Sequence, residues 1–222
     1  MVQLVNWHSS RGVCPRGRYI KDSGTIQVTK KLIIISGPDR VGKSTVCSEL
    51  IDRLGETNCE IVHLAEPPLD QEDPYDINRN KIQEWVASDK EWCFFDRSYP
   101  CSMVFEEHRR GNAGHLSHIV DLEIELMRCA DTFKVGHVVF QREWNWSAKH
   151  HLAEIDLLHP NAAEWAKRDK YIARMREHEL YYDRIKNFVT NTTAFPTYWH
   201  HASPWADSDA ITIIDTMKEL LK

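Results

Sequence analysis

The hydrophobic positions of the chain fall into short runs separated by longer stretches with helical spacing. The first run, residues 32–35, consists of branched apolar residues and is typical of a strand buried on both faces of a sheet. Further runs and stretches of helical periodicity follow. The pattern predicts strands at 32–35, 60–64, 92–95, 135–140 and 197–201, and helices at 43–54, 77–88, 102–110, 115–129, 165–189 and 210–221.

This alternation of strands and helices predicts an α/β fold, with a central parallel five-stranded sheet between two helical layers. No internal repeat and no Gly/Ser-rich linker divides the chain of 222 residues, which is long enough for one domain with a sizeable core. We therefore expect an N-terminal extension at 1–30 and a single domain at 31–222. The charged helix predicted at 165–189 is expected to face solvent.

Composition excludes several classes of protein. With 42% hydrophobic and 27% charged residues, the chain is neither disordered nor of low complexity. Its longest apolar run is far short of the roughly 20 residues that cross a bilayer, and its start lacks the pattern of a secretory signal. We expect a soluble cytoplasmic protein with no membrane partner. The six cysteines form no C-x-x-C and the twelve histidines no H-E-x-x-H, which favours reduced thiols and histidines without a metal.

Charge is unevenly distributed along the chain. The net charge is −5, yet residues 1–31 carry six Lys or Arg against one Asp, a local +5 that leaves −10 on the remainder. An acidic body does not attract polyanions over its whole surface. The basic extension has two interpretations, a solvated tail or a contact to nucleic acid such as DNA.

One motif lies between the first strand and the first helix. It fits G-x-x-x-x-G-K-[ST], whose glycines let backbone N–H groups converge on phosphate oxygens at a helix N-terminus. The lysine supplies charge to the β- and γ-phosphates, and the serine supplies a hydroxyl to Mg²⁺. The motif predicts a P-loop that binds ATP and Mg²⁺ through Gly37-Pro38-Asp39-Arg40-Val41-Gly42-Lys43-Ser44, followed by Thr45.

A second candidate is the dipeptide Asp96-Arg97, which directly follows the third strand. In a doubly wound sheet the carboxyl ends of the strands meet beside the phosphate loop. An acid there can hold Mg²⁺ or accept a proton, and an arginine can bind a phosphate group. We therefore expect Ser44 and Asp96 as metal ligands and Lys43 and Asp96 as catalytic residues.

These segments resemble thymidylate kinases, whose phosphate loop reads D-R-[AS]-G-K-[ST]-T where this chain has residues 39–45, and whose D-R-Y-x-x-S-S segment is similar to residues 96–102. The resemblance spans roughly 31–221 in element order. It implies that Arg40 stabilises charge on the γ-phosphate, that Asp39 lies near the acceptor sugar and that Arg97 holds an acceptor phosphate. It also places residues 202–204 near adenine. The substrate-binding residues it implies are Arg97, Ser98, Ser102, Phe105 and Glu106.

The sequence departs from that family at two segments. Residues 65–68 read Ala-Glu-Pro-Pro where the family has R-E-P-G, and residues 104–106 read Val-Phe-Glu where the family has A-Y-[QN] to recognise thymine. Glu66-Pro67 and Asp96-Arg97-Ser98 also resemble the E-P-V and [DE]-R-S segments of deoxynucleoside kinases. Those enzymes phosphorylate a hydroxyl, which must lose a proton, so Glu66 is a candidate catalytic base alongside Asp96.

Residues 141–176 are predicted to form a small lid that closes over the phosphates. Trp144 and Trp146 lie within it and either pack or stack on a base. The available cations of the lid region are Arg142, Lys149, Lys167, Arg168, Arg174 and Arg176.

The sequence thus predicts a kinase that transfers the γ-phosphoryl group of ATP, with Mg²⁺, to a pyrimidine deoxynucleotide. The acceptor would be dTMP or a 5-substituted dUMP such as 5-hydroxymethyl-dUMP, because the base-reading segment is changed. One alternative is a kinase of the hydroxymethyl group of 5-hydroxymethyluracil in DNA, contacted through the N-terminal extension and the lid. A second alternative is a non-catalytic nucleotide-binding switch. A homodimer is compatible with each of these functions.

Overall fold

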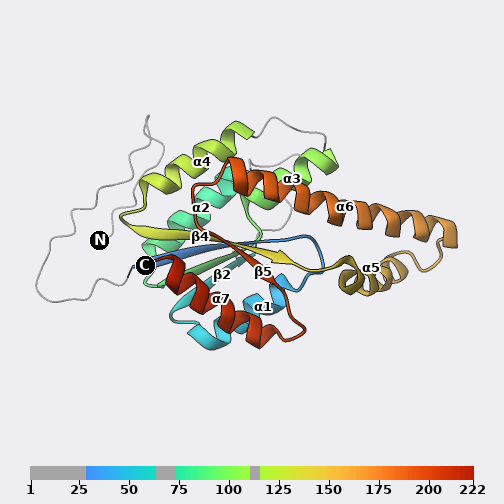
Figure 1. The fold of residues 1–222 in the computed structure, drawn as a ribbon, viewed down its shortest axis with the longest axis horizontal. Helices are drawn as coiled ribbons and strands as arrows, with labels where there is room; N and C mark the ends of the chain where they lie inside the picture. The colour runs from blue at the N-terminus through green and yellow to red at the C-terminus, as the bar shows by residue number, and fades with distance from the viewer. Residues whose placement is uncertain (1–28, 64–73, 111–115) are drawn as a thin grey trace, which may run out of the picture.

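A computed structural model describes residues 29–63, 74–110 and 116–222 of the chain. Within these residues strands and helices alternate along most of the chain (Figure 1). The elements are β1 (Lys30–Ser36), α1 (Lys43–Leu54), β2 (Cys59–His63), α2 (Pro74–Ala87), β3 (Trp92–Asp96), α3 (Tyr99–Arg110), α4 (Leu116–Arg128), β4 (Phe133–Gln141), α5 (Trp144–Leu158), α6 (Glu164–Asn191), β5 (Thr197–His201) and α7 (Ala206–Leu220).

The sheet is parallel throughout, with strand order β2-β3-β1-β4-β5. Its central strands are the continuous apolar runs of the sequence, which suit a sheet covered on both faces. Register aligns their carboxyl ends: Ile35 of β1 pairs with Asp96 of β3, and Ser36 with Val139 of β4. The loop after β1 and the end of β3 therefore meet at one edge of the sheet.

Helices cover both faces of this sheet. In Figure 1, α2, α3, α4 and α6 lie above it and α1 and α7 below it. Each layer has its own core, the upper one built around Trp85, Tyr99 and Tyr181 and the lower one around Leu50 and Met217. The predicted three-layer α/β/α fold with a five-stranded parallel sheet is confirmed.

One helix was not predicted from the sequence. Residues 144–158, assigned only to a lid, form α5, whose buried positions are Ser147, His151 and Ile155. Together with the first half of α6 this helix projects from the body (Figure 1), and we call residues 144–176 the arm. The expectation that the helix at 165–189 faces solvent is wrong for the later half of α6. Its buried residues extend from His178 to Phe188, and Tyr181, Ile185 and Phe188 pack in the upper core.

The five cysteines of the described residues are buried and unbridged, as predicted for reduced thiols. Cys14 lies outside the described residues. No helix of the described part is both long enough and apolar enough to span a bilayer.

Candidate active site

The loop between β1 and α1 is shaped by two glycines with positive φ. Gly37 has a φ of 155° and lies so close to β4 that a Cβ there would be 3.0 Å from the Cβ of Phe140. Gly42 directly precedes α1 and adopts the left-handed conformation, with a φ of 99°. The glycines of the motif therefore serve a tight turn and a close approach, which side chains at either position would disturb.

Lys43 is the first residue of α1 and is only 4% exposed. Its ammonium donates hydrogen bonds to the carbonyl oxygens of Gly37 (2.9 Å) and Pro38 (2.6 Å). Burial lowers the pKa of Lys43, and the nearby Arg97 guanidinium lowers it further. A buried ammonium at a helix N-terminus stabilises an anion, and an anion in turn stabilises the charged lysine.

Ser44 and Asp96 meet across the edge of the sheet. The Ser44 hydroxyl donates to Asp96 Oδ2 at 2.6 Å, and His63 Nδ1 lies 2.9 Å from the same oxygen. Asp96 is 4% exposed, and within the described part of the chain its Oδ1 is buried without a hydrogen-bond partner. A buried carboxylate oxygen without a partner beside a serine hydroxyl fits a Mg²⁺ ion, which takes few protein ligands and keeps several waters.

His63 was not among the residues predicted for this site. It ends β2, and the register pairs it with Asp96 on β3, so the neighbouring strand ends bring the two side chains together. The predicted strand at 60–64 already placed His63 near the end of the sheet. His63 was still not selected, because it belongs to no recognisable motif.

Arg97 pairs with Asp39 of the loop through a hydrogen-bonded ion pair. Burial disfavours the charge of Arg97, but Asp39, Cys101 and Asp96 together more than offset this and raise its pKa above the usual value. Arg97 has a φ of 72°, which is uncommon for a residue with a side chain and is typical of functional sites. The strand end and the loop, predicted to be neighbours, are thus joined directly.

Arg40 is held from the other side, by the arm. Its guanidinium lies 2.5 Å from Glu154 Oε1 of α5, and its carbonyl oxygen accepts a hydrogen bond from Ser147 Oγ at 3.3 Å. Arg40 also has a positive φ of 63°. Sequence reasoning missed Glu154, which lies 114 positions away and belongs to no motif.

Two tyrosines of α6 anchor this edge of the sheet. The Gly37 N–H donates to Tyr181 Oη at 2.8 Å, and the same hydroxyl lies 3.1 Å from Cys101 Sγ on α3. Tyr182 Oη accepts from the N–H of Arg142 at 3.0 Å, just after β4. Tyr181 is buried and Tyr182 partly buried, and this burial raises the pKa of both phenols, in the case of Tyr182 to about 12. They act as neutral hydrogen-bonding groups.

The far end of the site is formed by the segments after β4 and β5. Arg142 donates to the carbonyl oxygens of Ala202 (3.4 Å) and Ser203, and its guanidinium lies 4.1 Å from the ring centre of Trp146. Asp209 accepts from the Ser203 N–H. Ser203 and Pro204, which the resemblance places near adenine, line the same cavity as the phosphate loop.

These groups surround a cavity of about 640 Å³, a volume in the range of small-molecule sites. Its wall combines the loop and the first turn of α1 with the end of β3, the arm and residues 203–209. Four arginines line this wall, more than any other charged residue type: Arg40, Arg97, Arg142 and Arg174.

Several predicted residues do not contribute to the cavity wall. Ser98 is buried and donates to Asn78 Oδ1. Val41 does line the cavity, while its side chain also packs in the lower core. Ser102 lies in the first turns of α3, where its N–H donates to the Ser98 carbonyl oxygen. Trp144 is used for packing, stacked on His151 and donating to Tyr171 Oη at 3.0 Å. Glu66 and the side chains of Phe105 and Glu106 lie outside the described residues.

Comparison with known proteins supports the fold. No protein-family model matches the chain, and no curated protein sequence matches it. Among solved structures, polyphosphate kinase 2 from Arthrobacter aurescens TC1 has a TM-score of 0.62 at 17% identity, over 87% of this chain and 68% of that one. A putative polyphosphate kinase 2 from Pseudomonas aeruginosa PA01 gives 0.60 at 15% identity, over 87% and 42%. The chain has the fold of P-loop kinases.

A third similar structure is the YorR protein from Bacillus subtilis, in complex with phosphorylated GDP. Its TM-score is 0.53 at 17% identity, over 84% of this chain and 95% of that one. At such identities the similarity establishes the fold, while the chemistry must be argued from the residues of the site.

Proposed function

We propose that the protein is a Mg²⁺- and ATP-dependent phosphotransferase whose acceptor is a pyrimidine deoxynucleotide, dTMP or a 5-substituted dUMP such as 5-hydroxymethyl-dUMP. The observation that carries the phosphotransferase reaction is the contact of Ser44 with Asp96 beside the buried Lys43. Ser44 and Asp96 would form the metal site, and Lys43 would bind phosphate at the N-terminus of α1, all at one edge of the cavity.

Each of these groups has a role in the transfer. The loop N–H groups and Lys43 bind the β- and γ-phosphates, and Ser44 and Asp96 hold Mg²⁺, which neutralises charge on the phosphate oxygens. Arg40 stabilises charge that develops on the γ-phosphoryl group. Adenine would lie toward Ser203, where Arg142 fixes the backbone of the loop after β5.

The assignment of the acceptor rests on Arg97. Its guanidinium lines the cavity next to the loop and is oriented by Asp39, so it can bind the phosphate of a nucleoside monophosphate opposite the γ-phosphate. A monophosphate is already anionic and needs alignment rather than a base. Val104-Phe105-Glu106, which differs from the thymine-reading segment of thymidylate kinases, is the reason to include 5-substituted bases.

The alternative acceptor, 5-hydroxymethyluracil in DNA, has less support from the described residues. Of its two candidate stacking residues, Trp144 is packed between His151 and Tyr171, and Trp146 alone lines the cavity. The basic extension and Glu66 lie outside the described residues. A non-catalytic switch would need fewer of the charged residues that converge here.

The experiment is transfer of label from γ-labelled ATP, with Mg²⁺, to two sets of acceptors. One set contains deoxynucleosides and their monophosphates, including 5-hydroxymethyl-dUMP; the other contains DNA with and without 5-hydroxymethyluracil. We expect label on a free pyrimidine monophosphate, and none with Lys43→Ala. Label on the modified DNA alone would replace the proposal with a DNA-base kinase. ATP binding without label on either set would favour the switch.

A further inference from the structure

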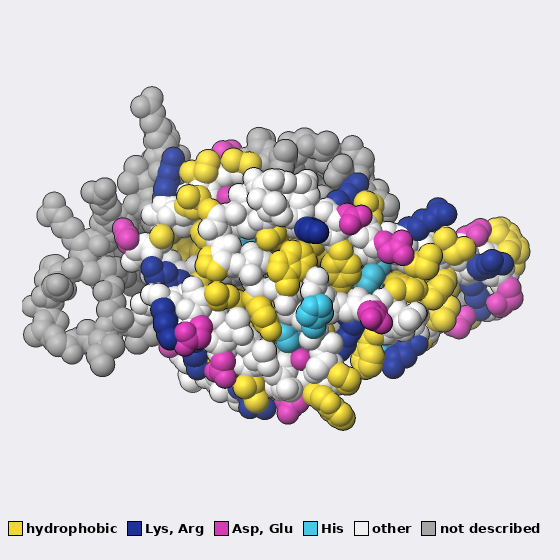
Figure 2. All heavy atoms as spheres, in the orientation of Figure 1, with side chains coloured by type: hydrophobic (Ala, Val, Ile, Leu, Met, Phe, Trp, Pro, Cys, Tyr) yellow, Lys and Arg dark blue, Asp and Glu magenta, His cyan; other side chains and the backbone are white. Residues whose placement is uncertain are grey.

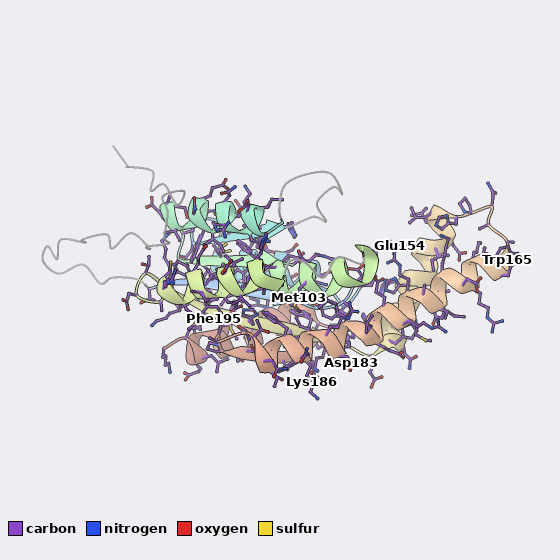
Figure 3. All side chains as sticks on the ribbon, turned by 90° about the horizontal axis from the view of Figure 1, so that it is seen from above. Met103, Glu154, Trp165, Asp183, Lys186 and Phe195 are labelled. Carbon is purple, nitrogen blue, oxygen red and sulfur yellow. The ribbon has the colours of Figure 1, made fainter. Side chains whose placement is uncertain are left out.

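The arm contacts the phosphate loop at Arg40. Arg40 Nη2 and Glu154 Oε1 lie 2.5 Å apart, and both side chains line the cavity. Figure 3 shows Glu154 near the base of the arm, beside the body, whereas Trp165 marks the outer end. The contact is therefore at the site and not at the exposed tip.

The same helix also holds the backbone of Arg40. Ser147 is fully buried, and its hydroxyl donates to the Arg40 carbonyl oxygen at 3.3 Å. Ser147 and Glu154 are seven residues apart, so they lie on one face of α5. The left-handed backbone of Arg40, with φ 63°, is unfavourable for an arginine unless its surroundings fix it. Two contacts from one helix fix both ends of this residue.

A carboxylate and a phosphate make the same kind of hydrogen bond with a guanidinium. Glu154 therefore accepts from Nη2 of Arg40, a group to which a terminal phosphate oxygen of the nucleotide would bind. His151 lies beside this pair, with Nδ1 3.7 Å from Glu154 Oε2. Burial lowers the pKa of His151 and keeps its imidazole neutral, so it does not compete with Arg40 for the carboxylate charge.

We propose that Glu154 is a positioning residue that holds Arg40 against α5 and releases it to the terminal phosphate of the donor nucleotide. This role rests on the proposed function. Because the pair must separate when the triphosphate binds, Glu154 weakens the binding of Mg·ATP. It has no such effect on AMP, which lacks that phosphate group.

A double-mutant cycle tests this role. Glu154→Gln keeps the size of the side chain and removes its charge, and it should tighten the Kd for Mg·ATP about three- to fivefold, the range of a partly exposed ion pair. The Kd for AMP should stay unchanged. In an Arg40→Gln background the same substitution should have no effect on Mg·ATP binding.

Asp156→Asn is the matched control, because Asp156 lies on the same helix and pairs with Lys167 instead of the loop. It should leave the Kd for Mg·ATP unchanged. Thermal unfolding verifies that each variant is folded, and Glu154→Ala completes the cycle should Glu154→Gln unfold. Equal effects of Glu154→Gln with and without Arg40, or equal effects on ATP and AMP, would overturn the role.

The outcomes also separate this inference from the proposed function. Failure of the wild-type protein to bind Mg·ATP would overturn both. Binding of Mg·ATP that depends on Lys43, together with an additive cycle, would overturn the role of Glu154 alone.

Discussion

Asp39 and Arg40 are neighbours in the phosphate loop, yet two different parts of the molecule hold them. Asp39 pairs with Arg97 at the end of β3, within the body, and the two side chains are 26% and 35% exposed. Arg40 pairs with Glu154 of the arm, with 47% and 28% exposed. The body side is tied to the sheet through strand register, whereas the arm side depends on one helix with few buried apolar residues.

This difference separates the fixed part of the site from the adjustable part. Lys43, Asp96 and Tyr181 are all buried in the body and hold the loop to β3 and α6. The arm adds charged side chains such as Glu154, and a shift in the position of α5 would move those of this helix together. On the face of the arm that Figure 2 shows, basic, acidic and apolar side chains are mixed.

The largest effect should come from the body. Lys43→Ala should lower kcat by about 10³-fold or more, because a charged group aimed at the transferred phosphoryl is lost. Steady-state transfer to the best acceptor measures this. Lys167→Ala, on the arm and paired with Asp156, is the matched control and should leave kcat within about twofold. Comparable losses in both variants would remove the distinction between body and arm.

Arg97→Ala tests the acceptor side of the body. Loss of a charged hydrogen-bond donor should reduce kcat/KM for a monophosphate acceptor about 10- to 100-fold. A hydroxyl acceptor should lose much less, since it offers no phosphate to Arg97. Arg184→Ala, whose guanidinium donates to the Val104 carbonyl oxygen, provides a matched arginine outside the cavity. An equal loss for both acceptor types would mean that Arg97 only orients Asp39.

Acid should destabilise the body through His137. Burial lowers the pKa of this imidazole to about 3, below its unfolded value of about 6.5. The unfolded chain therefore binds the proton first, and stability present above pH 6.5 is lost as the pH falls toward 3. Between pH 7.5 and 5 this histidine accounts for about 2 kcal/mol of unfolding free energy.

Urea unfolding at the two pH values measures this contribution. His137→Gln should show a correspondingly smaller loss between pH 7.5 and 5. Phe195→Leu, which removes the ring stacked on His137 but keeps the imidazole, should keep the pH dependence of the wild type. A pH dependence that His137→Gln leaves intact would assign it to other groups.

The smallest effects compare the two anchors of the loop. Tyr181→Phe removes the acceptor of the Gly37 N–H in a fully buried place and should cost about 1–2 kcal/mol of stability. Ser147→Ala removes the longer hydrogen bond from the arm and should cost about 0.5–1 kcal/mol. Chemical denaturation ranks them, and the reverse order would mean that the arm anchors the loop more strongly.

Sequence alone predicted the sheet and the position of the glycine-rich loop beside the end of β3, because both follow simple rules. Strands buried on both faces are continuous apolar runs, and the glycine-rich loop is recognisable wherever it joins a strand to a helix. Asp96 and Arg97 became candidates because a predicted strand ended there. Their contact with Ser44 and Asp39 then follows from the parallel register.

The arm escaped prediction for an equally physical reason. Its buried positions do have helical spacing, but two of them are the polar residues Ser147 and His151, with only Ile155 apolar. A search for apolar periodicity cannot detect such a face. Several of its large apolar residues, among them Leu157 and Leu158, are exposed. Glu154 was missed together with its helix.

The length of α6 gives the arm a mechanical property. The helix has 28 residues, about 42 Å at 1.5 Å per residue, and it is continuous from the arm into the core. Tyr181, whose hydroxyl accepts from Gly37, lies 16 residues from Trp165, or about 24 Å along the axis. A pivot of 5° at Tyr181 would therefore move the outer end by about 2 Å. Rotation of α6 about Tyr181 would thus couple movement of the arm to the first glycine of the phosphate loop, because Tyr181 contacts Gly37.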